Sequence, residues 1–192
     1  MRLLIMGAPG AGKGTQAQGI ASHYGIPPIS TGSMFRESVA RGTELGCKIE
    51  QLLASGEFVP DQLTEQVVAE RLQQPDASKG WLLDGYPRTM HQVSALDDFL
   101  SGRGQTLDAV IALTVNRESL VARLVLRGTL EGRSDDNEQT IRRRFDNYET
   151  QTRPLLAEYA RRGLVLQIDG AGPISEVSAR IAEALDVRKA QV

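Results

Sequence analysis

Short apolar runs alternate along the chain with longer segments in which apolar residues recur at helical spacing. Four runs have the length of buried strands, and a fifth, weaker run lies between the first two. They span residues 3–6, 28–30, 81–83, 109–115 and 164–168. Continuous apolar runs of this kind are typical of strands that are covered on both faces. Strands that alternate with helices predict an α/β fold, in which helices cover both faces of a parallel sheet.

Two segments interrupt this alternation because they lack a strand pattern. Residues 30–74 have helical spacing, and residues 128–132 form a short glycine-rich stretch. Gly42, Gly46 and Gly56 divide the first segment, as turns or helix ends do. We expect both segments to be insertions over the sheet, although the glycines by themselves indicate only turns.

Composition and charge exclude several classes of function. The 192 residues fit one domain, and the net charge of −2 gives no indication of nucleic-acid binding. The single Cys47 excludes an internal disulfide and a cysteine-rich zinc site, and His23 and His91 lack metal-binding spacing. The first apolar run is too short for a signal peptide, and no run approaches the ~20 residues of a membrane helix. We therefore expect a cytoplasmic protein without membrane or nucleic-acid partners.

The strongest chemical motif is G-A-P-G-A-G-K-G-T at residues 7–15, between the first apolar run and a helical segment. Its glycines let the backbone bring successive N–H groups to phosphate oxygens, and the following helix adds a positive N-terminus. Lys13 adds a full charge for the β- and γ-phosphates. Gly14 occupies the Ser/Thr position of the general G-x-x-x-x-G-K-[ST] pattern, and Thr15 follows one residue later. The strand, loop, helix and lysine together predict nucleotide binding rather than a simple turn.

Together with this loop, three further segments resemble those of the adenylate kinases and related nucleoside monophosphate kinases. Residues 30–36 read S-T-G-S-M-F-R, residues 84–88 read D-G-Y-P-R with Gln92 downstream, and residues 132–136 read G-R-S-D-D. The second segment is highly specific, whereas the loop alone identifies only a superfamily. The resemblance covers essentially the whole chain. It implies a doubly wound, five-stranded parallel sheet of the P-loop NTPase type and reversible transfer of a phosphoryl group from ATP to AMP, with Mg²⁺.

The resemblance also divides the chain into one kinase domain with two interruptions. The implied core comprises residues 1–29, 60–125 and 137–192, the helical AMP-binding insertion residues 30–59, and the short lid residues 126–136. Because this lid contains no cysteine, the structural zinc of long-lid relatives cannot be built, and we expect no zinc. We expect a monomer whose partners are ATP, AMP and ADP.

Individual residues acquire roles from the same resemblance. The residues implied to bind ATP are Gly10, Ala11, Gly12, Lys13, Gly14, Thr15, Arg123, Arg127 and Gly172. Those implied to bind AMP are Thr31, Arg36, Glu57, Phe58, Val59, Gly85, Tyr86, Pro87, Arg88, Gln92, Arg133 and Arg144. The implied catalytic residues are Lys13, Arg88, Arg133 and Arg144. Phosphoryl transfer requires mainly positioning and charge stabilisation, which cations around the phosphates supply.

The residue types suit these roles. A guanidinium matches phosphate oxygens, which fits Arg36 and Arg88 at the acceptor's α-phosphate. The Gln92 amide offers a donor and an acceptor to the Watson–Crick edge of adenine. Asp84 ends a predicted strand, where phosphate-loop enzymes place the carboxylate that holds Mg²⁺, often through water. Ser33 stands where the family usually has Asp, which removes a carboxylate near the water shell of the metal.

Two alternatives share the predicted nucleotide site. The closer one is a kinase of the same fold with a pyrimidine monophosphate acceptor, and Thr31 and Gln92 argue against it because pyrimidine kinases usually carry other residues there. The other is a nucleotide-binding regulator without turnover. The intact Lys13, Arg88 and lid arginines argue against this second alternative.

Overall fold

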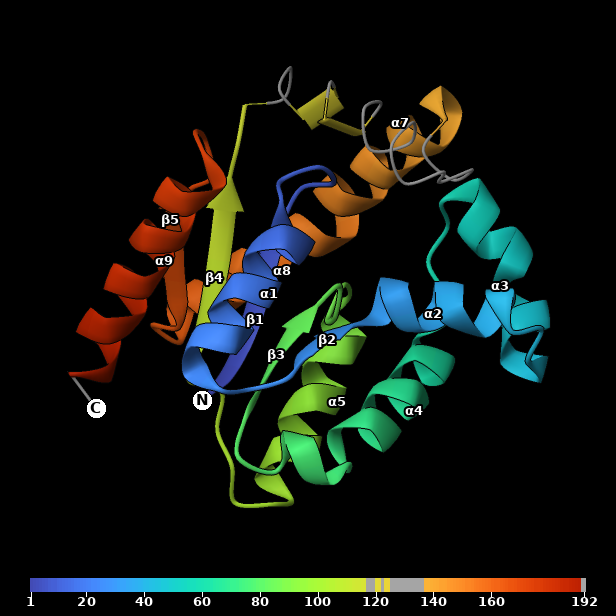
Figure 1. Cartoon of the computed structure of the whole chain (residues 1–192). Coiled ribbons are helices and arrows are strands. Elements are labelled where there is room, and N and C mark those ends of the chain that lie inside the picture. Colours follow the sequence, from blue (N-terminus) through green and yellow to red (C-terminus); the bar gives the residue numbers. More distant parts are fainter. Residues whose placement is uncertain (117–119, 122, 125–136, 191–192) are drawn as a thin grey trace.

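Five strands form one parallel sheet at the centre of the molecule (Figure 1). The computed structural model describes residues 1–116, 120–121, 123–124 and 137–190. The strands are β1 (Arg2–Gly7), β2 (Pro28–Ser30), β3 (Trp81–Asp84), β4 (Ala109–Thr114) and β5 (Val165–Asp169), in the order β2-β3-β1-β4-β5. Every neighbouring pair is parallel. The predicted α/β fold is confirmed, and no strand end differs from its predicted run by more than one residue.

The helices of the described residues follow the predicted alternation. They are α1 (Lys13–Tyr24), α2 (Thr31–Ala40), α3 (Glu44–Ser55), α4 (Asp61–Leu72), α5 (Met90–Ser101), α7 (Glu138–Asn147), α8 (Arg153–Arg161) and α9 (Ile174–Lys189). A 3₁₀ turn, η1 (Pro75–Ala77), precedes β3, and a π-helical turn, η2 (Tyr148–Thr152), joins α7 to α8. Side-chain oxygens fix where four of these helices begin, because each accepts a backbone N–H of the first turn. These caps are Ser30 for α2, Thr43 for α3, Thr89 for α5 and Asn137 for α7.

Two hydrophobic cores lie on opposite faces of the sheet, and successive residues of each central strand pack into one or the other. In β1, Leu3 and Ile5 pack with α1 and α9, whereas Leu4 and Met6 pack with α4, α5 and α8. Side chains of successive strand residues point to opposite faces of the sheet. Because helices cover both faces, the central residues of such a strand are all buried and apolar. The continuous apolar runs in the sequence result from this two-sided burial.

A third, smaller core lies beyond the sheet, where α2 and α3 pack together (Figure 1). It contains Phe35 of α2, Ile49 of α3 and Val59, which follows α3. All three side chains are buried. The helices of residues 31–55 are therefore held by an apolar cluster of their own, and this cluster fixes the segment that follows α3.

The carboxyl ends of the strands meet at one edge of the sheet because all the strands run in the same direction. The register pairs Asp84 of β3 with Ile5 of β1 on one side and with Ser30 of β2 on the other. The chain leaves β1 for α1 on one face and leaves β3 for α5 on the other. Adjacent strands whose connections leave on opposite faces create a crevice at their carboxyl ends, which is the usual ligand position in open α/β sheets.

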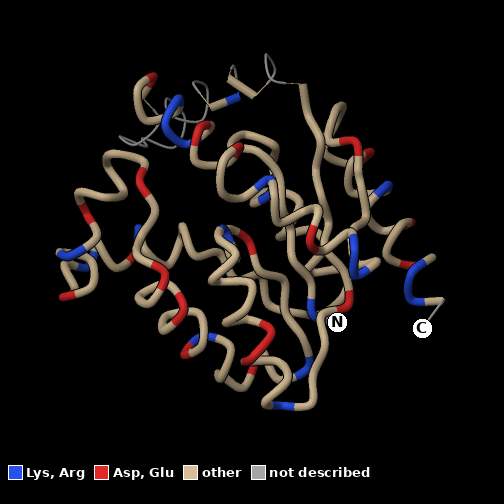
Figure 2. The backbone as a smooth tube through the Cα atoms, turned by 180° about the vertical axis from the view of Figure 1, so that it is seen from behind, with Lys and Arg blue, Asp and Glu red and all other residues tan. Residues whose placement is uncertain are grey.

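Charged residues of both signs occur throughout the described chain. Figure 2 shows Lys and Arg interspersed with Asp and Glu along the backbone. This distribution agrees with the net charge of −2. Among the residues that the structure describes, no helix combines the length and apolar character required to cross a membrane.

Two helical glycines differ in their surroundings and should therefore respond oppositely to substitution by alanine. A Cβ on Gly46 of α3 would lie 2.2 Å from the carbonyl oxygen of Ser38 in α2, whereas the nearest atom to a Cβ on Gly19 of α1 is Ser178 Oγ, at 3.9 Å. We expect Gly46→Ala to lower the free energy of unfolding by about 1–3 kcal/mol through overpacking. Gly19→Ala should raise it by about 0.5–1 kcal/mol through helix propensity. Urea unfolding measures both, and shifts of the same sign would contradict the α2–α3 packing described.

Candidate functional site

A cleft of about 1190 Å³ opens at the carboxyl edge of the sheet. Its lining combines the loop after β1, the start of α2, the segment after α3, the loop after β3, part of α7 and the turn after β5. Sites for one small ligand typically measure roughly 300–1,000 Å³. The cleft is large enough for two small ligands side by side.

The loop after β1 presents backbone N–H groups and one lysine to the cleft. Gly10 and Gly12 have φ of +83° and +87°, a conformation that favours glycine. Gly12 precedes α1 and has no side chain to cap it, and the N-terminus of a helix favours an anion. Lys13 Nζ donates to the carbonyl oxygens of Gly7 and Ala8, at 2.8 and 3.0 Å, which holds the ammonium across the loop. The loop thus has the geometry of a phosphate site.

Five arginines line the cleft, and three of them, from different elements, influence one another through their charges. Arg36 comes from α2, Arg88 follows β3, and Arg144 comes from α7. Burial lowers the pKa of Arg88; the Asp84 carboxylate opposes this shift, and the charges of Arg144 and Arg36 add to it. Arginine nevertheless stays protonated in proteins because its ordinary pKa is above about 12. The like charges repel one another, and a polyanionic ligand would relieve that repulsion.

Arg88 is held in place by the backbone of its own motif and by an aromatic ring. Its Nε donates to the Gly85 carbonyl oxygen at 2.9 Å, and its guanidinium carbon lies 5.1 Å from the centroid of the Phe58 ring. Thr31 Oγ1 donates to the same carbonyl at 3.0 Å. Gly85 has φ of +84°, and a Cβ there would lie 2.8 Å from Thr31 Oγ1. Only glycine therefore fits the position that ties Thr31 to Arg88.

Gln92, in the first turn of α5, has a buried side chain that is hydrogen-bonded on two sides. Its Nε2 donates to Asp61 Oδ1, and its Oε1 accepts the backbone N–H of Arg88, each at 2.7 Å. Tyr86 and Pro87 are also buried, and the Tyr86 hydroxyl donates to the backbone carbonyl oxygen of Gln92 at 3.2 Å. Because an amide carries two N–H bonds and two lone pairs on oxygen, one of each remains for a ligand in the cleft.

The segment after α3 forms another wall of the cleft. Val59 is anchored in the third core, and Phe58 lies beside Arg88. The Glu57 side chain is exposed and forms an ion pair with Arg143 of α7 at 3.0 Å. The carboxylate of Glu57 is thus paired with α7, while the residue lines the cleft.

The structure brings the other predicted site residues that it describes to this cleft. Those on the predicted ATP side are Gly10, Ala11, Gly12, Lys13, Gly14, Thr15, Arg123 and Gly172. Asp84 also lines the cleft, and its Oδ2 lies 3.7 Å from where a Cβ on Gly14 would be. The predicted Arg127 and Arg133, with the predicted lid at 126–136, lie outside the described residues.

Two residues that support the site, Asp61 and Thr89, are not among those predicted from the sequence. Thr89 Oγ1 donates to Asp61 Oδ2 at 2.8 Å, and Asp61 in turn accepts from Gln92. The T-x-x-Q spacing of Thr89 and Gln92 resembles a capping box and is a signal that could have located Thr89. Asp61 has no comparable signal, because an acidic residue in the first turn of a helix is usual for electrostatic reasons alone.

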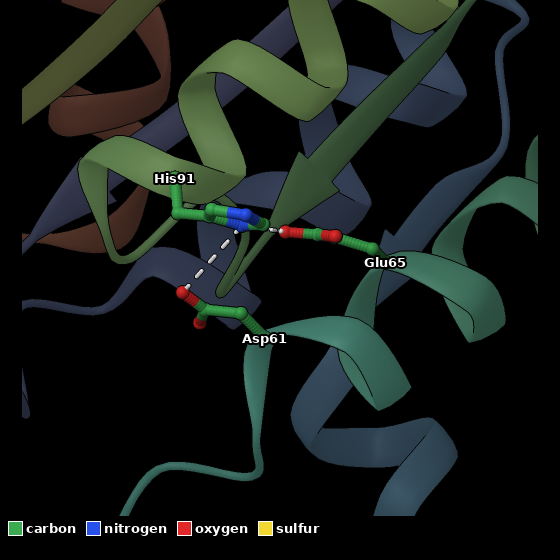
Figure 3. Close-up of side chains that lie close together, drawn as sticks. All are labelled: Asp61, Glu65 and His91. Atoms are coloured by element: carbon green, nitrogen blue, oxygen red, sulfur yellow. Dashed lines mark hydrogen bonds and ion pairs between the residues drawn. The ribbon is translucent and has the colours of Figure 1, made fainter.

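One further group of ionisable side chains lies beside the site (Figure 3). His91 Nδ1 is 2.7 Å from Glu65 Oε1 and 3.9 Å from Asp61 Oδ2. The hydrogen bond from His91 to Glu65 raises the pKa of His91. Three such side chains are also potential metal ligands. However, both Asp61 oxygens already accept hydrogen bonds, from Gln92 and Thr89, so we interpret the group as an ion pair attached to the site.

Comparisons with known proteins agree with one another. A family model described as adenylate kinase matches residues 5–164. An adenylate kinase of Nocardioides sp. is 53% identical over 187 residues, which cover 97% of this chain and 98% of the relative. An adenylate kinase of Clavibacter michiganensis is 52% identical, with 96% and 92% covered. An adenylate kinase of Thermobifida fusca is 48% identical, with 98% and 100% covered.

The raised pKa of His91 predicts a pH-dependent contribution to stability. A histidine whose pKa is higher in the folded state binds its proton more tightly there, so its contribution is fully present below the unfolded pKa. The contribution is lost as the pH rises through the folded pKa. Between about pH 6 and pH 8, the parent's free energy of unfolding should therefore fall relative to that of His91→Asn.

Urea unfolding at several pH values measures this difference. Glu65→Gln removes the hydrogen-bonding carboxylate, so its free energy of unfolding should depend less on pH over the same range. The double variant should differ little from either single variant in this pH dependence. A parent and a His91→Asn variant with parallel pH profiles would contradict the ion pair.

Proposed function

The chain belongs to the adenylate kinase family and is a phosphotransferase that acts between ATP and AMP, and we propose that the reaction takes place with Mg²⁺ in the cleft at the carboxyl edge of the sheet. The reversible transfer gives two ADP. One observation carries the assignment of the cleft: the phosphate loop, Lys13 and five arginines line the same space. Two nucleotides with several phosphates need this concentration of cations, because phosphoryl transfer depends on positioning and charge stabilisation.

ATP is assigned to the side of the cleft that contains the loop after β1. Its β- and γ-phosphates would accept hydrogen bonds from the loop N–H groups and from Lys13, whose ammonium already spans the loop. Arg123 and Gly172 line the cleft and would contact the rest of the donor nucleotide, with Arg127 beyond the described residues.

AMP is assigned to the side that α2, the segment after α3 and the D-G-Y-P-R motif enclose. Arg36 and Arg88 would bind its α-phosphate, since a guanidinium offers parallel N–H bonds to phosphate oxygens. The remaining N–H and lone pair of Gln92 would read the Watson–Crick edge of adenine. Arg88 would thus hold the phosphate of the same nucleotide whose base Gln92 holds, and the hydrogen bond from the Arg88 backbone N–H to Gln92 Oε1 connects the two residues.

Asp84 fits a site for Mg²⁺. The carboxylate ends β3 beside Gly14, and Thr15, also lining the cleft, follows in the first turn of α1. Oxygen ligands suit Mg²⁺, which keeps several of its waters, so Asp84 would hold the ion through water. When bound, the ion neutralises charge on the β- and γ-phosphate oxygens. Ser33 provides no charge here, and its hydroxyl accepts a hydrogen bond from Arg36 at 3.4 Å.

Closure over the two nucleotides would complete the site. We assign residues 30–59 to an insertion that closes over AMP and residues 126–136 to a short lid over ATP. Arg133 from the lid and Arg144 from α7 would then stabilise the transferring phosphoryl group. Exclusion of water strengthens such contacts and protects the phosphoryl group from hydrolysis. A monomer in the cytoplasm, which the sequence predicts, is compatible with a site built from one chain.

The first test of this function is a choice of acceptor. With ATP and Mg²⁺, a coupled assay of ADP formation should give the highest kcat/KM with AMP, ahead of CMP, UMP and GMP. EDTA should abolish turnover with every acceptor, while urea unfolding without nucleotide should stay unchanged. Equal or faster turnover of CMP or UMP would support the pyrimidine alternative instead.

Substitution of two arginines on α7 distinguishes a specific role of Arg144 from a general effect of positive charge. Arg144 lines the cleft, whereas Arg142 is exposed and pairs with Glu138 of the same helix at 2.7 Å. Arg144→Ala should lower kcat by a factor on the order of 10²–10⁴, with a much smaller change in the KM for ATP, because the contact counts mainly in the transition state. Arg142→Ala should keep kcat within about twofold. Equal losses in the two variants would argue against a specific role for Arg144.

A further inference from the structure

Gln92 and adenine both have a donor beside an acceptor, so the orientation of the Gln92 amide decides which base it can read. Adenine presents its 6-amino group as a donor and N1 as an acceptor. A 6-oxopurine presents the reverse, with O6 as an acceptor and N1–H as a donor. The amide matches adenine only if its oxygen faces the 6-amino group and its nitrogen faces N1.

Two partners fix this orientation in the structure. The Asp61 carboxylate can only accept a hydrogen bond, and Gln92 Nε2 donates to it at 2.7 Å. The Arg88 backbone N–H can only donate, and Gln92 Oε1 accepts it at 2.7 Å. A flipped amide would set two acceptors against each other at Asp61 and two donors against each other at Arg88. Gln92 is only 2% exposed, so water cannot easily replace either partner.

Asp61 is itself held in place by its neighbours. It is the first residue of α4, and its second carboxylate oxygen accepts from Thr89 Oγ1 at 2.8 Å. Thr89 also caps α5, the helix that carries Gln92. The exposed His91 side chain lies 3.9 Å from the same oxygen (Figure 3). The carboxylate thus joins the start of α4 to the start of α5 and directs one oxygen at the Gln92 amide.

We propose that Asp61 is a positioning residue that fixes the Gln92 amide and thereby makes the acceptor site select a 6-aminopurine over a 6-oxopurine. Asp61 acts through Gln92 and has no role in the transfer itself. The inference rests on the proposed binding of AMP beside Gln92. It predicts that changes at Asp61 alter the ratio of kcat/KM for AMP to that for IMP, which carries a 6-oxo base, and leave the KM for ATP unchanged.

Two substitutions at Asp61 distinguish positioning from a structural role. Asp61→Asn loses the charge at the start of α4 but can turn its amide oxygen to Gln92 and its amide nitrogen to Thr89 Oγ1. Asp61→Glu keeps the charge, and with it the favourable interaction with the helix N-terminus, but moves the carboxylate by one methylene. If charge at the helix start were the whole role of Asp61, Glu would be tolerated better than Asn. Positioning of Gln92 requires the reverse order.

The experiment compares AMP with IMP as acceptors at saturating ATP and Mg²⁺. Asp61→Glu should lower the AMP-to-IMP ratio of kcat/KM about tenfold, and Asp61→Asn should keep it within about threefold. The KM for ATP should stay within about twofold in both. His91→Asn, which removes the neighbouring ion pair and leaves the two hydrogen bonds of the Gln92 amide, should keep the parent's ratio. Urea unfolding checks that each variant is folded.

Gln92→Ala separates failure of this inference from failure of the proposed acceptor site. If Gln92→Ala lowers the AMP-to-IMP ratio and Asp61→Glu does not, Asp61 does not position the amide and the inference is wrong. A Gln92→Ala variant with the parent's ratio would show that the base is read elsewhere, which overturns both the base assignment and the inference. If Asp61→Asn loses as much selectivity as Asp61→Glu, the inference alone is wrong, because the order of the two variants that positioning of Gln92 requires would not hold.

Discussion

Concentrated positive charge at the carboxyl edge of the sheet is the constraint on which the other features of the site depend. Guanidinium groups that line one cleft repel each other, and burial adds to the cost of charging Arg88. The fold offsets this cost locally: Asp84 lies close enough to favour the charged form, the Gly85 carbonyl accepts from Arg88 Nε, and the Phe58 ring lies against the guanidinium. The arginines that line the cleft can attract polyanionic ligands, which a phosphotransferase needs.

The parallel sheet makes this concentration possible because it brings the ends of distant strands together. The loop after β1 and the motif after β3 leave the sheet on opposite faces, so a crevice opens between them. The α2–α3 segment adds a wall with a core of its own, and the ion pair between Glu57 and Arg143 joins that wall to α7. Residues from both ends of the chain thus surround one space.

Polar positions within the site are as specific as the charged ones. The Gly85 carbonyl serves both Thr31 and Arg88, which explains why a residue without Cβ stands there. The Gln92 amide is satisfied on one side by a backbone N–H and on the other by a carboxylate from a different helix. Such buried networks keep their members in one arrangement, because each flip or rotation leaves a polar group without a partner.

The sequence by itself determined the five strands and the phosphate loop, because two-sided burial leaves continuous apolar runs and the loop is a contiguous motif. It also identified most residues of the cleft through their resemblance to a family, although not how they meet. Only the tertiary structure brought Arg36, Arg88 and Arg144 into one space and paired Asp61 with Gln92. Contacts between residues this far apart leave no local pattern, and an acid at the start of a helix looks the same whether it serves the helix or a buried amide. Which of these two roles Asp61 has depends on how α4 and α5 pack.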